Sequence, residues 1–387
     1  SDEESLISIS ADPAILATQI TKSEGCYEVD GWYTESSYND DELYTAGAVT
    51  EDLVLYPKWA LREDLGEQEL NEYFAKKLYN YTVKSDGTLR IDLIIDSSVS
   101  ELVIPDSVYI DGKKYTVTEI GEGAVMNIKT LITVDLSGAK SLTRIGRNAF
   151  AYCPNLREVI IPDTGLNVTY IGENAFRGTE FINSYKTATG YDFAVIGSVL
   201  VKYVGDTAVT EINVDTTNVL LAKVDTIAPG AFSELTALET VTIGDGIKFI
   251  YDKAFYKDTA LATVLGGGGL EYVASDAFDQ TAYVSTRPVD DPATPTDEST
   301  FLRIGSIYYR YVGTGKSAEI PAGVKVIAPN AFSTGHLIEN ITFGDASQIK
   351  SIGTDAFANT KWISENHTTA ETGDENTFVQ DGFVVIN

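Results

Sequence analysis

The stretch Leu142-Thr-Arg-Ile145-Gly146-Arg-Asn-Ala149-Phe150 sets a pattern that returns along most of the chain. Written as apolar, x, x, Ile or Val, small, x, x, Ala, Phe, the pattern recurs around six further phenylalanines, and a weaker copy ends in Val. Ile or Val stands five residues before every final position. Eight copies in register indicate a repeat protein. The final positions are Val125, Phe150, Phe176, Phe232, Phe255, Phe278, Phe332 and Phe357.

The spacing of these copies indicates the kind of repeat. Successive final positions are separated by 25, 26, 56, 23, 23, 54 and 25 residues, so the unit is 23 to 26 residues long. This length falls inside the roughly 20 to 29 residues of leucine-rich repeats. One unit has too few apolar groups to fold alone, whereas stacked units bury Phe and Ile against each other, at about 1.5–3 kcal/mol per fully buried side chain. The pattern predicts a solenoid.

A β-rich run follows each Ala-Phe pair and its short polar turn. The runs carry the L-x-x-L-x-L signature, and their last apolar residues alternate with period two, as expected for a strand with one buried face. We expect one such strand per repeat, paired in parallel into a curved sheet. The runs are residues 131–136, 156–161, 238–243, 261–265 and 338–343.

Several hairpins are also predicted. Asp86-Gly87 and Asp111-Gly112 each separate two β-rich runs, which favours hairpins over residues 81–91 and 109–117. Residues 193–205 align without a gap with residues 301–313, and residues 378–386 begin a third copy. A hairpin insert of about 30 residues every few repeats explains the two long spacings.

The combination Leu-x-x-Val-x-Ile-(Pro), then Val-x-x-Ile-Gly-x-x-Ala-Phe, resembles the BspA-like leucine-rich-repeat family of bacterial surface proteins. The turn at residues 149–156 and the strand ending at Ile160-Ile161-Pro162 fit the family pattern residue by residue. The resemblance covers residues 81–387. It implies a β-rich leucine-rich-repeat solenoid, a location at the bacterial cell surface or outside the cell, and adhesion to extracellular-matrix proteins. The chain departs from the family in having Cys at the repeat turn only once, at Cys153, and from other leucine-rich repeats in lacking an Asn ladder.

A different module is predicted at the N-terminus. Residues 25–34, which contain Gly31-Trp32-Tyr33-Thr34, and residues 49–59, which close with Leu55-Tyr-Pro-Lys-Trp59, resemble the internalin B-repeat, also called the Listeria-Bacteroides repeat. The resemblance implies a small β-grasp-like module over residues 1–60, used as a spacer or adhesion unit. Trp32 and Trp59 are interpreted as core residues rather than a sugar platform. Helical spacing in residues 61–80 predicts a connecting helix that caps the solenoid.

Composition restricts the partners. Lys and Arg number 28 against 57 Asp and Glu, a net charge of −29. An acidic field of this size repels phosphate groups, so nucleic acid and anionic lipid are poor partners. No apolar run approaches the ~18 residues of a membrane span, and neither a signal peptide nor an initiator Met is present. We therefore interpret the chain as a mature or trimmed secreted protein, with any anchor lying outside it.

The two cysteines, Cys26 and Cys153, fall in different predicted domains. Because Cys153 occupies a repeat-turn position that faces inward in the family, a buried free thiol is favoured over a disulfide.

The residues offer little for catalysis. Only His336 and His367 are candidates for a near-neutral base, and neither lies in a metal-binding or nucleophile motif. His336, in a repeat turn, is interpreted as a surface residue. The acidic segment 287–298 lacks the spacing of an EF-hand loop. We expect no enzyme activity, no cofactor and no metal site.

What remains is a binding surface. Residues between the inward positions of the predicted strands are expected to point to the concave face of the solenoid and to form a continuous array for a large partner. These Thr residues also suit strands through β-propensity alone. The expected partner is an extracellular protein; an extracellular glycan-binding module of a degradative system and a rigid structural spacer are the alternatives. The candidate ligand-binding residues are Thr133, Asp135, Glu158, Ile160, Thr240, Thr242, Thr263, Leu265, Asn340 and Thr342, with a second aromatic patch at Tyr308, Tyr309 and Tyr311.

Overall fold

The computed structural model describes residues 78–162, 166–215, 221–285 and 301–366, with residues 23–24, 27–37, 39, 41, 43 and 56–61 before them and 377–380 and 383–386 after them. Contacts between residues divide the chain into two units. One comprises Ser1–Tyr79 with Ser107–Tyr115, and the other comprises Asn80–Asp106 with Thr116–Asn387.

The N-terminal strands form an antiparallel sheet in the order β1 (Ser23–Glu24), β2 (Tyr27–Tyr33), β3 (Tyr56–Leu61). Val29 lies opposite Trp59, and Trp32 lies opposite Pro57. The side chains of Trp32 and Trp59 and residues 62–77 of the predicted connecting helix lie outside the described residues. At the ends of the predicted range the structure has strand instead, because Leu61 belongs to β3 and Tyr79 and Asn80 belong to β4 (Tyr79–Val83).

The second unit is a β-solenoid of about ten turns with mostly parallel strands and little helix. Each repeat contributes two strands rather than the single strand predicted. The strands of the L-x-x-L-x-L runs form what we call the Leu sheet: β6 (Glu101–Val103), β9 (Thr133–Asp135), β11 (Glu158–Ile160), β15 (Glu211–Val214), β17 (Thr240–Ile243), β19 (Thr263–Gly266), β23 (Ser317–Ile320) and β25 (Asn340–Phe343).

Two-residue strands at the repeated Ile or Val form a second sheet, the Ile sheet, and hairpins begin each of its sections. Its members are β4 (Tyr79–Val83), β5 (Leu89–Ile94), β7 (Ser107–Ile110), β8 (Lys113–Ile120), β10 (Arg144–Ile145), β12 (Tyr170–Ile171), β13 (Phe193–Ile196), β14 (Val199–Tyr203), β16 (Thr226–Ile227), β18 (Phe249–Ile250), β20 (Tyr272–Val273), β21 (Phe301–Ile304), β22 (Ile307–Tyr311), β24 (Val326–Ile327) and β26 (Ser351–Ile352).

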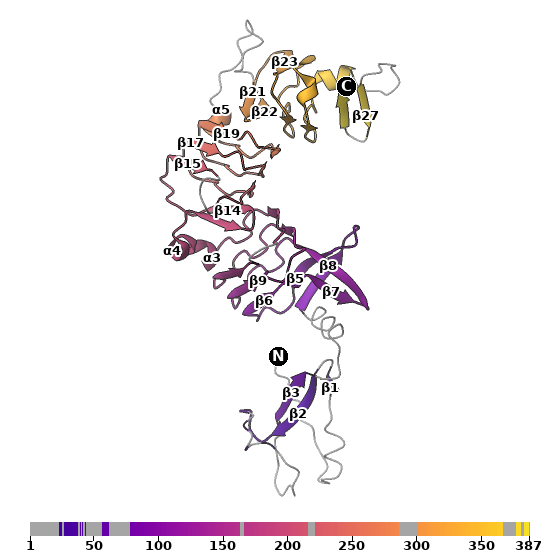
Figure 1. Cartoon of the computed structure of the whole chain (residues 1–387), viewed down its shortest axis with the longest axis vertical. Coiled ribbons are helices and arrows are strands. Elements are labelled where there is room, and N and C mark those ends of the chain that lie inside the picture. Colours follow the sequence, from indigo (N-terminus) through magenta and orange to yellow (C-terminus); the bar gives the residue numbers. More distant parts are fainter. Residues whose placement is uncertain are drawn as a thin grey trace. The chain divides into compact units, whose positions relative to one another are not determined.

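Both sheets are interrupted at the same two places, which divides the solenoid into three blocks (Figure 1). Each block opens with a predicted hairpin: β4–β5, β13–β14 or β21–β22. The second strand of each hairpin is part of the Ile sheet, because it pairs in parallel with the first two-residue or longer strand of that sheet in its block, as β22 does with β24. A further antiparallel hairpin, β27 (Thr377–Gln380) with β28 (Phe383–Ile386), matches the third predicted copy.

A buried threonine ends each block. Three residues after the last Phe of a block, the Thr hydroxyl donates to the carbonyl of that Phe at 2.7 to 2.8 Å and accepts from an N–H three residues further on at 3.3 to 3.4 Å. This local bonding favours a short helix over another Leu strand. The threonines are Thr179, Thr281 and Thr360, and the helices are α3 (Glu180–Asn183), α4 (Tyr185–Thr189), α5 (Ala282–Ser285) and α6 (Lys361–Asn366); a 3₁₀ turn, η3, spans Ala346–Gln348.

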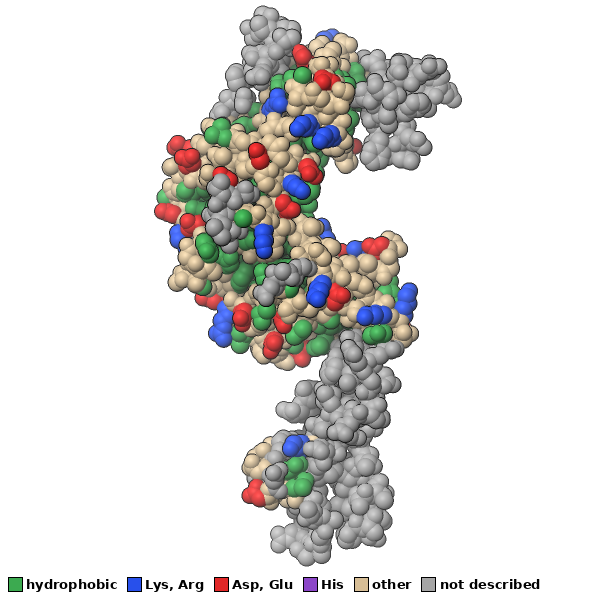
Figure 2. Space-filling view, in the orientation of Figure 1, with side chains coloured by type: hydrophobic (Ala, Val, Ile, Leu, Met, Phe, Trp, Pro, Cys, Tyr) green, Lys and Arg blue, Asp and Glu red, His purple; other side chains and the backbone are tan. Residues whose placement is uncertain are grey.

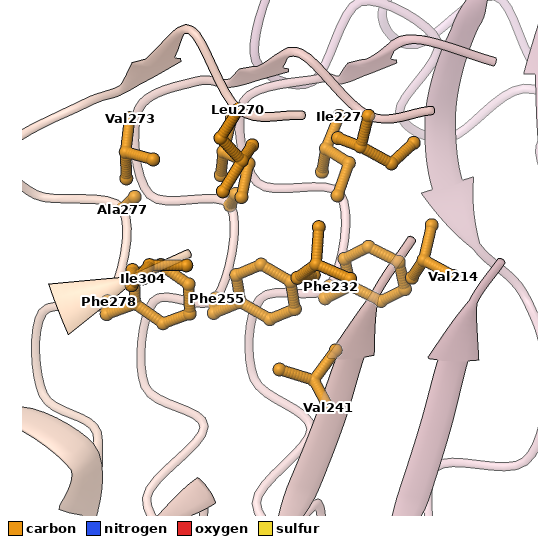
Figure 3. Close-up of a cluster of buried hydrophobic side chains, with 14 of the residues drawn as sticks. Val214, Ile227, Phe232, Val241, Phe255, Leu270, Val273, Ala277, Phe278 and Ile304 are labelled. Atoms are coloured by element: carbon orange, nitrogen blue, oxygen red, sulfur yellow. The ribbon is translucent and has the colours of Figure 1, made fainter. Parts of the chain in front are cut away.

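The core is a row of stacked phenylalanines, one from each repeat. In the middle block, the ring centroids of Phe232 and Phe255 lie 4.9 Å apart, those of Phe255 and Phe278 lie 4.8 Å apart, and the planes are within 7° of parallel (Figure 3). Side chains of the Ile sheet lie on one side of the row and Val241 of the Leu sheet lies on the other. At each block end an aromatic ring packs on the last Phe, as Trp362 does on Phe357 at 5.1 Å.

Phe255→Ala should destabilise the middle block by about 3–5 kcal/mol, because the ring is fully buried and touches a ring on either side. Urea unfolding followed by circular dichroism measures this loss. Leu265→Ala, at a side chain that is 50% exposed, should change the free energy of unfolding by less than about 0.5 kcal/mol. Equal losses from the two variants would contradict the role of the Phe row.

Candidate binding surfaces

The predicted ligand-binding residues lie on the outward face of the Leu sheet. Thr133 pairs with Glu101 on one side and Glu158 on the other, and Thr240 pairs with Glu211 and Thr263. These outward side chains are exposed or half-buried, whereas inward neighbours such as Val134 and Val241 are buried. The strands and their alternation are therefore confirmed.

The structure does not join these residues into the continuous array that was expected. Because the Leu sheet is interrupted at both block junctions, they form three separate groups. Thr133, Asp135, Glu158 and Ile160 belong to the first group, Thr240, Thr242, Thr263 and Leu265 to the second, and Asn340 and Thr342 to the third.

The predicted aromatic patch was wrong. Tyr308, Tyr309 and Tyr311 are 0%, 1% and 1% exposed. The reason is the position of β22 between two blocks: Tyr309 packs on Phe278 of the middle block at 5.6 Å, and Tyr308 stacks on Phe332 of the last block at 5.0 Å. These rings complete the core and are not available to a partner.

A half-buried aromatic cluster on the Ile sheet was not anticipated. Tyr251 meets Tyr170 edge to face at 4.9 Å and lies 5.6 Å from Tyr272, and the Arg144 guanidinium covers the Tyr170 ring at 3.8 Å. Burial raises the pKa of all three phenols. The sequence held a signal for this cluster: Tyr251 occupies the position after Ile or Val where every other copy has Gly or Ala.

A pocket of about 420 Å³ lies at the junction of the first and middle blocks. Its walls come from the turn that ends the first block, residues 172–178, from Val201 and Lys202 of β14, and from the turn at residues 229–234. The Lys202 ammonium donates to the Gly230 carbonyl at 2.8 Å and to the Ser233 hydroxyl at 3.3 Å. Burial lowers the pKa of this ammonium. Sequence reasoning did not single out Lys202.

Asp258 is a buried carboxyl close enough to Lys202 for their charges to interact. Burial raises its pKa to about 8, although the Leu235 N–H donates to Oδ1 at 2.8 Å and Lys202 favours the charged form. Oδ2 is buried without a hydrogen-bond partner. Asp258 occupies the turn position that Cys153 holds in the first block, three residues after Phe.

The structure describes one of the two cysteines and one of the two histidines. Cys153 is a buried free thiol, as predicted, and donates to the Val125 carbonyl at 3.0 Å. His336 is exposed, as predicted. Cys26, His367 and the segment 287–298 lie outside the described residues.

Among the described residues, no group of three His, Cys, Asp or Glu side chains is placed to hold a metal ion, and no helix is long and apolar enough to cross a membrane. On the face shown in Figure 2, acidic and basic side chains are interspersed.

These features define a leucine-rich-repeat solenoid in which each turn contributes one strand to each of two sheets. The sequence matches the BspA type leucine rich repeat region, in six copies, over residues 107–192, 195–285 and 302–379. The chain belongs to this family. No match covers the N-terminal residues that resemble the internalin B-repeat.

The chain also shows partial similarity to solved structures of bacterial proteins. The Treponema pallidum leucine-rich-repeat protein TpLRR is 17% identical, with 73% of this chain and 86% of that chain covered and a TM-score of 0.28. A Faecalibacterium prausnitzii cell surface protein is 17% identical, with 70% and 94% covered and a TM-score of 0.26. The pneumococcal vaccine antigen PcpA is 17% identical, with 73% and 65% covered and a TM-score of 0.25. No curated protein matches the sequence.

Asp258→Asn should remove the loss of stability that the natural protein shows as pH rises. With a folded pKa of about 8, above the ordinary value of 3.8, the folded state retains a proton that the unfolded state releases. Stability from this group is therefore full below about pH 4 and falls as pH rises to about 8, by up to about 1.4 kcal/mol per pH unit. Over this pH range the free energy of unfolding of the variant should rise relative to that of the natural protein, as measured by urea unfolding.

Asp345→Asn is the control, and its stability should depend on pH in the opposite direction. Hydrogen bonds from Ser347 and Gln348 lower the pKa of Asp345, so the Asp345 carboxylate stabilises the folded state at neutral pH and this stabilisation is lost on acidification. A difference between Asp258→Asn and the natural protein that does not change with pH would show that the buried carboxyl does not hold the proton.

Proposed function

We propose that the chain is a non-catalytic binding protein, secreted or held at a bacterial cell surface, that adheres to an extracellular protein through the outward face of the Leu sheet. Membership in the BspA type family supports the surface location. The observation that carries the binding role is the uncovered face of β15, β17 and β19, where polar side chains stand in parallel rows.

The charge and shape of this face favour a protein partner. Glu211, Thr240 and Thr263 form one row and Asn213 and Thr242 form the next, so hydrogen-bonding groups repeat at the spacing of neighbouring strands, about 4.8 Å. Exposed Leu265 adds apolar area at the edge of the rows. A broad face of this kind suits a large partner better than a small molecule.

In this proposal the chain has three parts. Residues 1–60 form a small β module of the internalin B-repeat type that serves as a spacer or second adhesion unit. Residues 61–80 connect it to the solenoid of residues 81–387, which carries the binding face.

Thr240→Arg/Thr242→Arg should abolish binding to the protein ligand, because two long charged side chains on β17 displace any partner seated on the rows. An array of matrix proteins and glycans, probed with the purified chain at two salt concentrations, identifies the ligand and measures the loss, expected to exceed about tenfold in Kd. Ser351→Arg/Thr354→Arg, at exposed residues in β26 of the Ile sheet and just after it, is the matched control and should bind normally. Equal loss from both variants would contradict the proposed face.

A second candidate function is glycan binding, which the Tyr170–Tyr251–Tyr272 cluster favours. Aromatic rings offer an apolar face and a polar edge, a combination that suits sugars. If a polysaccharide on the array binds, Tyr251→Ala should reduce that binding while Tyr152→Ala, at a ring that is 50% exposed on a repeat turn, leaves it intact. Absence of any ligand at micromolar concentration would favour the rigid spacer instead.

A further inference from the structure

Within a block, the repeat turns are joined by a row of backbone hydrogen bonds. Alternate N–H groups of one turn donate to carbonyls of the next: Asn148 to Glu173 at 3.1 Å, Phe150 to Ala175 at 2.8 Å, and Tyr152 to Arg177 at 2.7 Å. The turn at residues 230–234 is joined to its successor in the same way. This row satisfies three donors per turn that would otherwise be left without an acceptor.

At the end of the first block the row stops. The corresponding donors are the N–H groups of Asn174, Phe176 and Gly178, and none of them has a hydrogen-bond acceptor among the described residues. All three residues line the 420 Å³ pocket. Phe176 is buried, whereas Gly178 is half-buried and Asn174 is exposed. An unpaired N–H is costly when buried, so the Phe176 N–H in particular points to an external acceptor.

The second junction shows what fills the same place elsewhere in this chain. There the N–H of Phe278, the equivalent of Phe176, donates to the Tyr309 hydroxyl at 3.3 Å, and that hydroxyl donates to the Ser275 carbonyl at 3.0 Å. The Tyr309 ring packs on Phe278, and Arg310 bonds to Asp279 at 2.9 Å. Side chains of β22 thus fill this junction, and Tyr309 supplies an oxygen to one of the three equivalent donors, the Phe278 N–H.

At the first junction those side chains are replaced by smaller ones. The gapless alignment of residues 193–205 with 301–313 places Val201 at the position of Tyr309 and Lys202 at that of Arg310. Val201 has neither the ring nor the oxygen, and its side chain leaves the pocket open. Lys202 bonds instead to the following turn, through Gly230 and Ser233.

We propose that the pocket at the first junction binds a carboxylate. Its oxygens would accept from the N–H of Phe176, as the Tyr309 hydroxyl does from Phe278, and from a neighbouring N–H of Asn174 or Gly178. The Lys202 ammonium, already fixed in the wall by two hydrogen bonds, supplies the positive charge. Backbone donors in a turn together with a fixed cation are a recurrent arrangement for anions.

The charge of the pocket favours a monoanion. Arg177, Lys202 and Lys253 line it together with Glu173 and Glu234, so the lining admits an anion, while the whole chain carries −29. The field of the whole chain repels a phosphate dianion twice as strongly as a carboxylate, and a cation finds only donors at the N–H row. The carboxylate comes either from a free organic acid or from an Asp or Glu side chain of a partner protein.

The test uses the full chain labelled with ¹⁵N-phenylalanine, which gives fifteen backbone signals at most, with Phe176 assigned by Phe176→Leu. Sodium acetate represents a free acid and N-acetyl-aspartyl-N-methylamide represents a protein side chain, each titrated against sodium chloride at equal ionic strength. We expect the Phe176 N–H signal to shift with a Kd on the order of 1–10 mM, while the Phe278 signal does not move. Tighter binding of the aspartyl probe identifies a protein source; equal or weaker binding identifies a free acid.

Val201→Tyr/Lys202→Arg transplants the residues of the second junction and should fill the pocket from within. We expect this variant to stay folded and to lose the carboxylate-dependent shift of Phe176. Lys202→Met, which keeps the length of the side chain but removes its charge, should weaken binding at least about tenfold. No shift of Phe176 in the natural protein beyond that given by chloride, or an unchanged shift in Val201→Tyr/Lys202→Arg, would overturn the proposal.

Discussion

The face-to-face contact between phenylalanines of successive repeats is the interaction on which the solenoid depends. A ring inside a row, such as Phe255, has a ring about 5 Å away on both sides, so a repeat without neighbours has no core. The ends of a row therefore need special residues. Hairpin aromatics such as Tyr308 cover the row of the last block at its start, and the ring after the block-ending Thr, such as Trp362, covers its end.

Much of the fold could be predicted because it depends on spacing. A period of 23 to 26 residues, alternation in the Leu strands and Asp-Gly turns are each visible in the sequence. The Ile sheet was missed because its inner strands are two residues long, too short for alternation to appear. The sequence Phe-x-x-Thr marks the end of each block, but Thr179 cannot be told from other polar turn residues in the sequence alone. Its role is visible only in the hydrogen bond from its hydroxyl to the Phe176 carbonyl.

The candidate site was harder to predict, for a physical reason. Ile307-Tyr308-Tyr309-Arg310-Tyr311 was interpreted as an exposed aromatic hairpin because surface aromatics are common at interfaces. A strand between two blocks is covered on both faces, however, and a strand of this kind shows a continuous apolar run rather than alternation. Tyr251 was a clearer signal, since it breaks the rule of a small residue after Ile, but one of the rings it meets, Tyr170, belongs to the first block and lies far away in sequence.

A regular solenoid leaves few places for a small ligand, because each turn satisfies the backbone groups of the one before it. The junctions between blocks differ in this respect: a hairpin is inserted where a turn would otherwise follow, and its side chains must replace both the lost acceptors and the lost volume. At the second junction Tyr309 supplies an acceptor to the Phe278 N–H and, with Arg310, fills the space, whereas Val201 and Lys202 leave donors unpaired and space open at the first. Two residues on one strand therefore decide whether a junction is core or pocket. A repeat protein can in this way acquire a small-ligand site while its outward sheet remains available to a large partner.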